Sequence, residues 1–487
     1  MMCKIKIVRS LLRISFVYSL LNVPVSMTGQ RPVPANYPGN VPVNFIRTWD
    51  ALAPEDNGTD LLTRPLQDVR QTTQYLDGLG RPLQVVARKA SMETGGSATD
   101  LVTAIEYDGF GREQFKYLPF ASTANDGLFK TNPFQQQASF MQGQYGGQGE
   151  TFFYGQTIFQ ASPGGAPEKT MAPGNSWTGS SRGITQQQWA NTGTDDVKKW
   201  IVTNVTNGLG SYAVTGNYST GQLLKTITTD EHNKQVLEYK DKDGKVILKK
   251  VQLTASNDNG TGSGYTGWLC TYYIYDDIGN LRCVIQPEGV KTLAGTGWPS
   301  LSTTILNEQC FRYEYDPRNR MILKKVPGAG EVYMVYDQRD RLVMTQDANM
   351  RTQQKWMYTS YDALNRPVAT GLLTDPTNYN NPSYHRSAAA NSEAYPNLSN
   401  YSFEELTRTF YDDYSWLGTY GNPLPSAYNN QYDIYFLAAS NTAWPYPQSN
   451  SASNHTRGLT TGTMVKVLGQ TGGMGGSQGG TTYLYTV

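Results

Sequence analysis

A short unit built around Asp recurs along this chain and constrains its fold more than any other feature. It is clearest in Tyr315-Asp-Pro-Arg-Asn-Arg320, Tyr336-Asp-Gln-Arg-Asp-Arg341 and Tyr361-Asp-Ala-Leu-Asn-Arg366. Asp is followed three residues later by Gly, Asn or Asp, and one residue after that by Arg, Lys or Asn. The seven copies place these positions at Asp77, Gly80 and Arg81; Asp108, Gly111 and Arg112; Asp241, Gly244 and Lys245; Asp276, Gly279 and Asn280; Asp316, Asn319 and Arg320; Asp337, Asp340 and Arg341; and Asp362, Asn365 and Arg366.

This spacing predicts a hairpin turn in every copy. A three-residue hairpin loop uses a type I turn followed by one residue in the left-handed region. Gly enters that region at no steric cost, and Asn or Asp at little. The Asp side chain can accept hydrogen bonds from backbone N–H groups of the turn. In this register Asp316 lies opposite Arg320, and such a pair contributes roughly 0.2–1 kcal/mol.

The residues before the turn alternate as strands do. Phe311, Tyr313 and Tyr315 alternate with Arg312 and Glu314, which predicts a Tyr-rich apolar face and a solvent face that carries Arg312. An isolated hairpin is only marginally stable in water, so the units must stack on one another. We therefore expect an all-β fold of stacked hairpins.

The repeated unit resembles the YD repeat of the RHS family, which comprises bacterial wall and toxin-shell proteins. The N-terminal part is similar to the N-terminal domain, of no assigned function, of RHS repeat proteins from Bacteroidota. The segments that carry this second resemblance are Asn44-Phe-Ile-Arg-Thr-Trp49, Thr72-Thr-Gln-Tyr-Leu-Asp-Gly-Leu-Gly-Arg-Pro-Leu83, Phe152-Phe-Tyr-Gly155 and Ala172-Pro-Gly-Asn-Ser-Trp177.

The resemblance implies stacked YD hairpins that spiral into a β-sheet shell wall. In complete relatives this wall encloses a cargo. The expected function is an exported, non-enzymatic scaffold, whose partners are the remaining shell and a C-terminal toxin or other cargo domain. Asp316-Pro317 and Asp375-Pro376 do not sit within the rest of the family's self-cleavage motif, so no autoproteolytic residue is assigned.

Three segments follow from the order of these features. Residues 1–28 have a basic start and a short apolar run from Ile14 to Val25, which predicts a signal peptide and an extracytoplasmic, secreted or cell-surface location. Residues 29–195 form the N-terminal β-rich domain with two hairpin units. Residues 196–487 form the repeat region, which we expect to be incomplete at its C-terminus because the strand predicted over 481–487 has no turn or return strand after it.

Composition narrows the function classes. The formal net charge is +1, so no strong field draws nucleic acid, and no stretch after the signal segment is long and apolar enough for a transmembrane helix. Two alternatives to the scaffold stay open. One is a surface adhesion module that binds glycans or proteins through exposed aromatic residues, and the other is a secreted carbohydrate hydrolase.

Candidate chemistry is sparse, and we expect no catalytic, cofactor-binding or metal-binding residues. The chain has three His, at His232, His385 and His455, none near another in sequence. The segment 257–260 faintly resembles a calcium loop but lacks the closing Glu. In the simple hairpin register Cys283 lies opposite Tyr273, so a disulfide to Cys270 is not expected.

A degenerate eighth unit is expected at Tyr411 and Asp412. Ser415 and Trp416 stand where the Gly and Arg of the other copies would be. Gly-rich residues 469–480 are expected to form a loop before the last strand.

Overall fold

The fold is all-β and antiparallel, which confirms the predicted fold class. The computed structural model describes residues 31–52, 58–91, 96–161, 164–206, 208–420, 431, 455–468, 477–478 and 481–486. The predicted signal peptide and most of the Gly-rich loop lie outside these residues. The chain forms two compact units. Unit 1 runs up to Gln186 and includes Asp230–His232, and unit 2 comprises Gln187–Thr229 and the residues from Asn233 onward.

Unit 1 contains a five-stranded sheet in the order β1 (Asn44–Ala51), β2 (Val69–Leu76), β3 (Pro82–Ser91), β4 (Thr99–Ala104) and β6 (Phe120–Ala121). Helix α2 (Pro133–Tyr145) packs against β4 and β6. Buried Val86, Val102, Phe120 and Met141 form the core between them. A second antiparallel set comprises β5 (Phe115–Tyr117), β7 (Tyr154–Phe159), β8 (Pro167–Met171) and the start of β9 (Ile184–Ala190).

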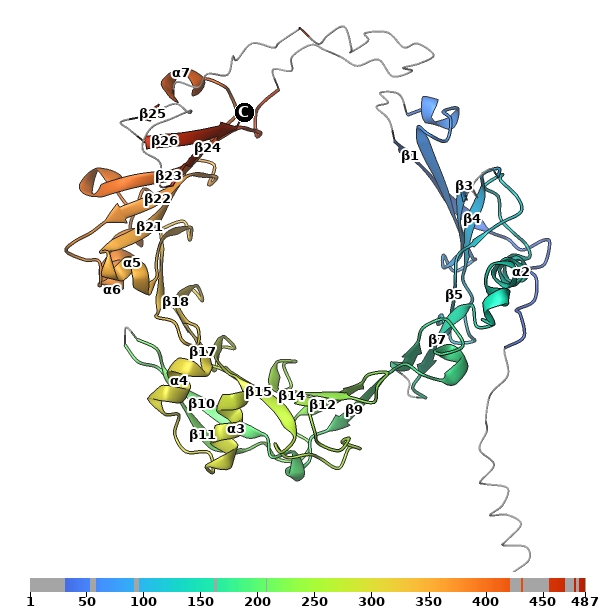
Figure 1. The fold of residues 1–487 in the computed structure, drawn as a ribbon, viewed down its shortest axis with the longest axis horizontal. Helices are drawn as coiled ribbons and strands as arrows, with labels where there is room; N and C mark the ends of the chain where they lie inside the picture. The colour runs from blue at the N-terminus through green and yellow to red at the C-terminus, as the bar shows by residue number, and fades with distance from the viewer. Residues whose placement is uncertain are drawn as a thin grey trace, which may run out of the picture. The chain divides into compact units, whose positions relative to one another are not determined.

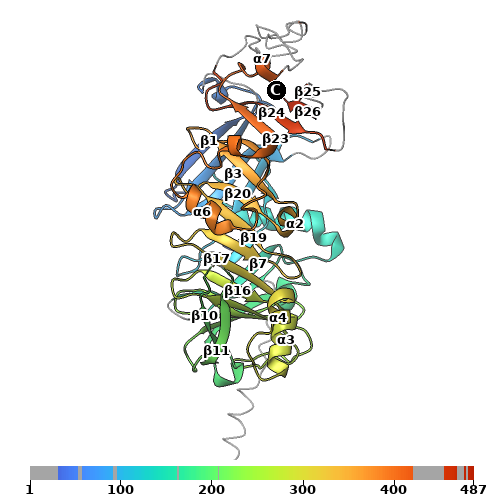
Figure 2. The ribbon, with the colours of Figure 1, turned by 90° about the vertical axis from the view of Figure 1, so that its left-hand side faces the viewer.

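The main sheet of unit 2 is a single run of antiparallel strands in which each pairs with the next. Figure 2 shows β16, β17, β19, β20 and β23 following one another in sequence order. The run comprises β12 (Leu224–Thr229), β13 (Gln235–Lys240), β14 (Val246–Gln252), β15 (Trp268–Tyr275), β16 (Leu281–Ile285), β17 (Cys310–Tyr315), β18 (Met321–Lys325), β19 (Val332–Tyr336), β20 (Leu342–Gln346), β21 (Lys355–Tyr361), β22 (Pro367–Thr374), β23 (Ser402–Tyr411), β24 (Thr460–Lys466) and β26 (Thr481–Thr486). The strand predicted near the C-terminus is therefore present as β26, and it pairs with β24 and with the short β25 (Ser477–Gln478).

One face of this run is covered by a hairpin that precedes it in the chain and by helices inserted between its strands. The hairpin β10 (Lys198–Thr203) and β11 (Ser211–Asn217), with helices α3 (Pro287–Gly295) and α4 (Thr303–Glu308), lies over β15 to β17 (Figure 1). Helix α6 (Pro382–Ala389) packs against β19, and helix α5 (Ala348–Thr352) against β21. The core lies under these elements, with Tyr272, Cys283, Ile285 and Leu293 among its fully buried members.

The covered face of β17 is the opposite of the predicted one. Cys310, Arg312 and Glu314 are buried, whereas Tyr313 and Tyr315 on the other face are half-buried. The Arg312 guanidinium donates to the Gly210 carbonyl at 2.8 Å, and the Glu314 carboxylate accepts from the Gly210 N–H at 2.6 Å. The β10–β11 connection thus supplies polar partners for these charges, and Arg312 does not face solvent.

The simple hairpin register is also wrong by one residue beyond each turn. Tyr275 pairs with Leu281, but Ile274 pairs with Cys283, so Arg282 is an extra residue on the return strand. This β-bulge places Cys283 opposite Ile274 and not opposite Tyr273. Cys270, Cys283 and Cys310 are all buried free thiols.

Candidate functional site

The seven predicted turns share one geometry. In every copy the backbone N–H of Asp donates to the carbonyl four residues later, and the N–H three residues later donates back to the Asp carbonyl. Asp337 is representative: its Oδ1 accepts the backbone N–H groups of Arg339 and Arg341, both at 2.9 Å. The third residue has positive φ throughout, from 59° at Asn319 to 92° at Gly279.

The residue that closes each turn forms an ion pair with the Asp of the same turn wherever it is Arg. The guanidinium nitrogens of Arg81, Arg112, Arg320, Arg341 and Arg366 lie 2.6–2.8 Å from those carboxylates. The backbone N–H of Arg81, followed by its side chain, lowers the pKa of Asp77, and Arg112 lowers the pKa of Asp108 in the same way. Lys245 does not repeat this contact; its ammonium lies 4.0 Å from Asp243.

Arg320 and Arg341 also bind the following turn, which sequence reasoning missed. Arg320 Nη1 donates to Asp340 Oδ1 at 2.7 Å, and Arg341 Nη1 donates to Asn365 Oδ1 at 3.0 Å. The left-handed residue of the next turn therefore accepts a hydrogen bond from the previous Arg when it is Asn or Asp. Where it is Gly111, the previous Arg81 Nη1 lies 2.8 Å from the position a Cβ would occupy.

In the turns at Asp337 and Asp362, the preceding Tyr completes this contact between turns. Tyr336 OH donates to the Met321 carbonyl, and Tyr361 OH to the Leu342 carbonyl, each at 3.0 Å. The guanidinium of the previous Arg lies over the Tyr ring, 4.9 Å from its centroid in both cases. Such a cation–π contact contributes roughly 0.5–1 kcal/mol at an exposed site. We call these Arg, Tyr and Asn or Asp contacts between consecutive turns the turn ladder.

The eighth turn exists, but it closes differently from the prediction. Tyr411 OH bonds the Pro367 carbonyl at 3.1 Å, and Arg366 binds the Asp412 carboxylate. The turn is completed by Gly458, whose N–H donates to Asp412 Oδ1, and by Leu459, whose carbonyl accepts the Asp412 N–H. Ser415 and Trp416 do not take the Gly and Arg positions, because the intervening segment is an insertion within the turn.

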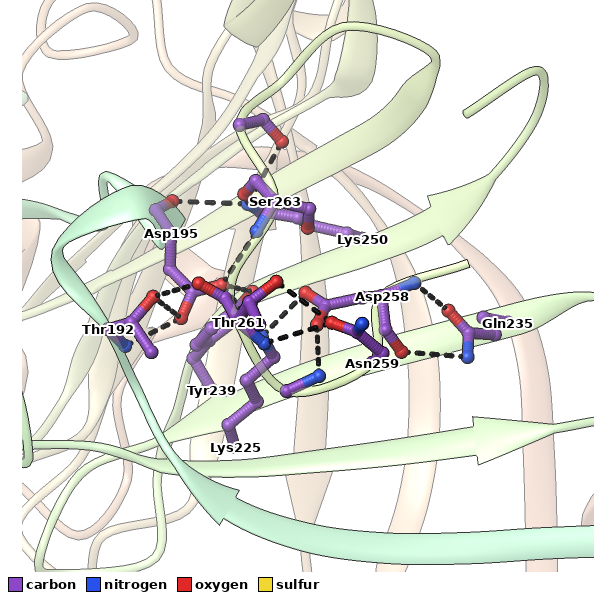
Figure 3. A network of polar contacts seen from close by, with 12 residues as sticks. Thr192, Asp195, Lys225, Gln235, Tyr239, Lys250, Asp258, Asn259, Thr261 and Ser263 are labelled. Carbon is purple, nitrogen blue, oxygen red and sulfur yellow. Dashed lines mark hydrogen bonds and ion pairs between the residues drawn. The ribbon is translucent and has the colours of Figure 1, made fainter. Parts of the chain in front are cut away.

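A buried charge network lies at the other end of unit 2 (Figure 3). Lys225 on β12 places its Nζ 2.8 Å from Asp195 Oδ1 and 2.5 Å from Asp258 Oδ2, and all three side chains have no exposed surface. Asp195 comes from the short 3₁₀ turn Gly193–Asp195, and Asp258 from the loop after β14. Tyr239 on β13 donates to Asp195 Oδ1 at 2.7 Å.

A second lysine borders this network. Lys250 on β14 donates to the backbone carbonyls of Asp195, Ser263 and Gly264. Burial lowers the pKa of Lys250 to about 8. Sequence alternation carried a signal for both lysines, since Lys225 stands two residues from buried Ile227 and Lys250 two residues from buried Leu248.

The remaining sequence candidates, His385 and Asp258, contact different partners. His385 on α6 is buried, with Nδ1 2.6 Å from Tyr395 OH and Nε2 3.4 Å from Asp375 Oδ2. Asp258 of the calcium-like segment directs a carboxylate oxygen at Lys225. Within the described residues no group of three or more His, Cys, Asp or Glu side chains is arranged to hold a metal ion. None of the described helices combines the length and apolar character needed to cross a bilayer.

Comparison with known proteins gives one family match and several distant structures. Residues 47–190 match the family model of a domain of unknown function, DUF6443. No curated protein sequence matches the chain. The Photorhabdus luminescens Tc holotoxin pore with a TccC3 mutation has 14% identity and a TM-score of 0.44 over 84% of this chain. The TcdB2-TccC3-TEV and TcdB2-TccC3 crystal structures have 17% and 14% identity, with TM-scores of 0.43 and 0.42 over 82% and 83% of this chain. The match covers 15–16% of each of these three chains.

Proposed function

We propose that this chain is a structural scaffold, a section of β-sheet wall that belongs to a larger RHS-type shell. The turn ladder carries the proposal. Each Arg closes its own turn and binds the next, so consecutive hairpins are held in one sheet by contacts that recur from Arg320 to Asp412. A residue pattern that serves only to join neighbouring hairpins is what an extended wall requires.

In this proposal the wall encloses or presents a C-terminal toxin or other cargo domain of a longer chain. The sequence resemblance to RHS shells supports this partner, and the basic and apolar start of the chain supports export. Export predicts that the mature protein begins near Gly29, which N-terminal mass spectrometry measures. Recovery of the intact N-terminus in the cytoplasm would remove the export part of the proposal.

Protease protection tests the scaffold function. In the full-length gene product, a cargo domain should resist digestion under conditions that degrade the same domain expressed alone. Replacing the ladder residues Arg341 and Asn365 together with Ala should open the wall and expose the cargo. Equal digestion of the free and the attached domain would contradict enclosure. The variant Lys291→Ala serves as the control, because the exposed Lys291 pairs with Glu288 of its own helix, α3, and not with a hairpin turn.

The adhesion alternative rests on a different observation. The turn tips of unit 1 carry Leu79 and Phe110, which are 78% and 86% exposed. Arg81 of the first turn lies against Gly111 of the second, so the two tips are neighbours, and exposed apolar residues on neighbouring tips mark contact surfaces in many proteins. A glycan array and a protein pull-down, with Phe110→Ser as the control variant, would separate adhesion from the scaffold function. The scaffold function requires neither a glycan ligand nor a protein ligand.

A further inference from the structure

We propose that Lys225 and Asp258 form an intramolecular isopeptide bond, with Asp195 as the group that transfers the proton. The amine and the two carboxylates are already in contact, at 2.5 Å from Lys225 Nζ to Asp258 Oδ2 and 2.8 Å to Asp195 Oδ1. All three side chains are shielded from water. This covalent link goes beyond the scaffold function and does not depend on it.

The two carboxylates differ in a way that assigns their roles. Asp195 accepts hydrogen bonds from Lys225, Tyr239 and the backbone of Thr192 and Ser263. Although burial alone raises the pKa of Asp195, these contacts with Lys225, Thr192 and Tyr239 outweigh it and hold the pKa below its ordinary value. Asp195 Oδ1 lies 2.8 Å from Lys225 Nζ, within the distance over which a positioned carboxylate can take and return a proton.

Asp258 accepts fewer hydrogen bonds than Asp195. Its carboxyl carbon, Cγ, is the atom that the amine attacks. Its Oδ2 is bonded to Lys225, and its Oδ1 accepts the Gly260 N–H at 2.8 Å. That N–H would stabilise the negative charge that develops on Oδ1 when the tetrahedral intermediate forms. The oxygen nearest the amine, Oδ2, would then be the leaving group.

The reaction balances without an oxidant or other co-reactant. The Lys225 ammonium gives one proton through Asp195 to Asp258 Oδ2, and the free amine attacks Asp258 Cγ. The Nζ–Cγ bond forms, the Cγ–Oδ2 bond breaks, and a second proton passes from Nζ through Asp195 to the departing oxygen. The products are a neutral amide and one water molecule, and Asp195 is returned unchanged.

The dry environment favours this condensation. Each buried ion carries a desolvation cost. Amide formation removes one positive and one negative charge from the interior and releases water. Without the link, the charged Asp195 carboxylate stays buried in contact with Tyr239 and with the loop that contains Ser263 (Figure 3).

A similar set of groups in unit 1 provides a contrast. Lys130 lies 2.9 Å from Asp100 and 2.6 Å from Asp126, but the Asp126 side chain is 48% exposed. Asp100 is buried, but water reaches the Asp126 carboxylate, so only one of the two carboxylates at Lys130 is dry and we expect Lys130 to stay unlinked. Lys250 also stays free, because its contacts are to backbone carbonyls, which are unreactive amides.

The link would tie β12 to a loop that lies 33 residues further along the chain. Peptide mapping of the purified wild-type protein tests it directly. Digestion should yield one branched peptide that joins Lys225 to Asp258, with a mass lower than the sum of its parts by one water. The Lys130 peptide should be recovered linear. Recovery of the Lys225 and Asp258 peptides only as separate linear species, from protein digested after denaturation, would overturn the proposal.

Variants assign the roles. Lys225→Met and Asp258→Ala should each abolish the branched peptide. Asp195→Ala keeps both linking residues, so loss of the branched peptide there, with the sheet intact by circular dichroism, supports proton transfer by Asp195. An undiminished yield in Asp195→Ala would overturn that role. Lys249→Met removes a partly exposed amine from strand β14, away from the network, and should leave the yield unchanged.

Discussion

Arg341 closes one hairpin turn and binds the next: its Nε lies 2.7 Å from Asp337 Oδ2, and its Nη1 lies 3.0 Å from Asn365 Oδ1. The two contacts use different edges of one planar guanidinium, which a lysine ammonium cannot imitate. The strength of the coupling between hairpins therefore depends on the identity of this residue and not only on its charge.

Arg341→Lys should lower the free energy of unfolding by about 1–3 kcal/mol, because it leaves the buried Asp337 carboxylate with fewer charge-assisted hydrogen bonds. Urea unfolding measures the change. Arg318→Lys is the control, since the Arg318 and Asp340 side chains are 57% and 55% exposed, and it should cost about 0–1 kcal/mol. Equal losses in the two variants would contradict a special role of Arg341.

The first turn offers a matched pair of glycines. A Cβ at Gly78 or at Gly80 would meet nothing within 4 Å, but only Gly80 has a positive φ, of 78°. Gly80→Ala should destabilise the protein by about 1–2 kcal/mol, the cost of a left-handed conformation for an L-residue. Gly78→Ala should be neutral or stabilising by about 0.4–1 kcal/mol. Thermal unfolding of the pair isolates the backbone conformation, and equal melting temperatures would contradict the turn assignment.

The eighth turn should weaken in acid. Hydrogen bonds from Arg366, and then from the Gly458 N–H, lower the pKa of Asp412 to about 2. An unfolded Asp titrates near about 3.9, so the contribution of Asp412 is fully present above that pH and is lost as the pH falls toward about 2. Asp412→Asn should lack this part of the acid dependence. Melting temperatures of both proteins across this window measure it, and parallel curves would contradict the assignment.

His385 should make the docking of α6 pH-dependent. Burial lowers the pKa of His385, against the opposing effect of Asp375. The docked helix therefore resists protonation that the undocked one accepts, and the stability of docking falls as the pH drops below about 6.5. Hydrogen exchange of α6 should quicken between about pH 7 and 5.5 in the wild type. His385→Gln should remove that change, and an unaltered pH profile would contradict it.

The turns could be predicted from the sequence because the interactions that form them are local. A left-handed position admits few residue types, so Gly, Asn and Asp at a fixed distance from Asp identify the turn. The bulge at Arg282 could not be predicted, because the extra residue of a bulge can be of any type. Only the pairing of Ile274 with Cys283 reveals it.

The buried face of β17 and the charge network depend on distant segments. The local pattern predicts that Arg312 and Glu314 face solvent. Their backbone partner, Gly210, lies about a hundred residues earlier in the chain, so the pattern does not include it. Lys225 meets Asp195 and Asp258 only when the 3₁₀ turn and the loop after β14 fold over β12. The alternation of residues predicts that Lys225 faces inward, but it does not identify the carboxylates that bind it.

The eighth turn shows that such a hairpin tolerates a long inserted segment, here between Asp412 and Gly458. The Asp412 N–H still reaches a carbonyl and its carboxylate still binds Arg366, although the partner of the turn is Leu459 and not the residue four positions later. Loop-closure entropy grows only slowly with length, so the sheet beneath is little affected by what its tip contains. Each tip is thus a natural point of attachment at which recombination or engineering can graft a new segment without redesigning the sheet.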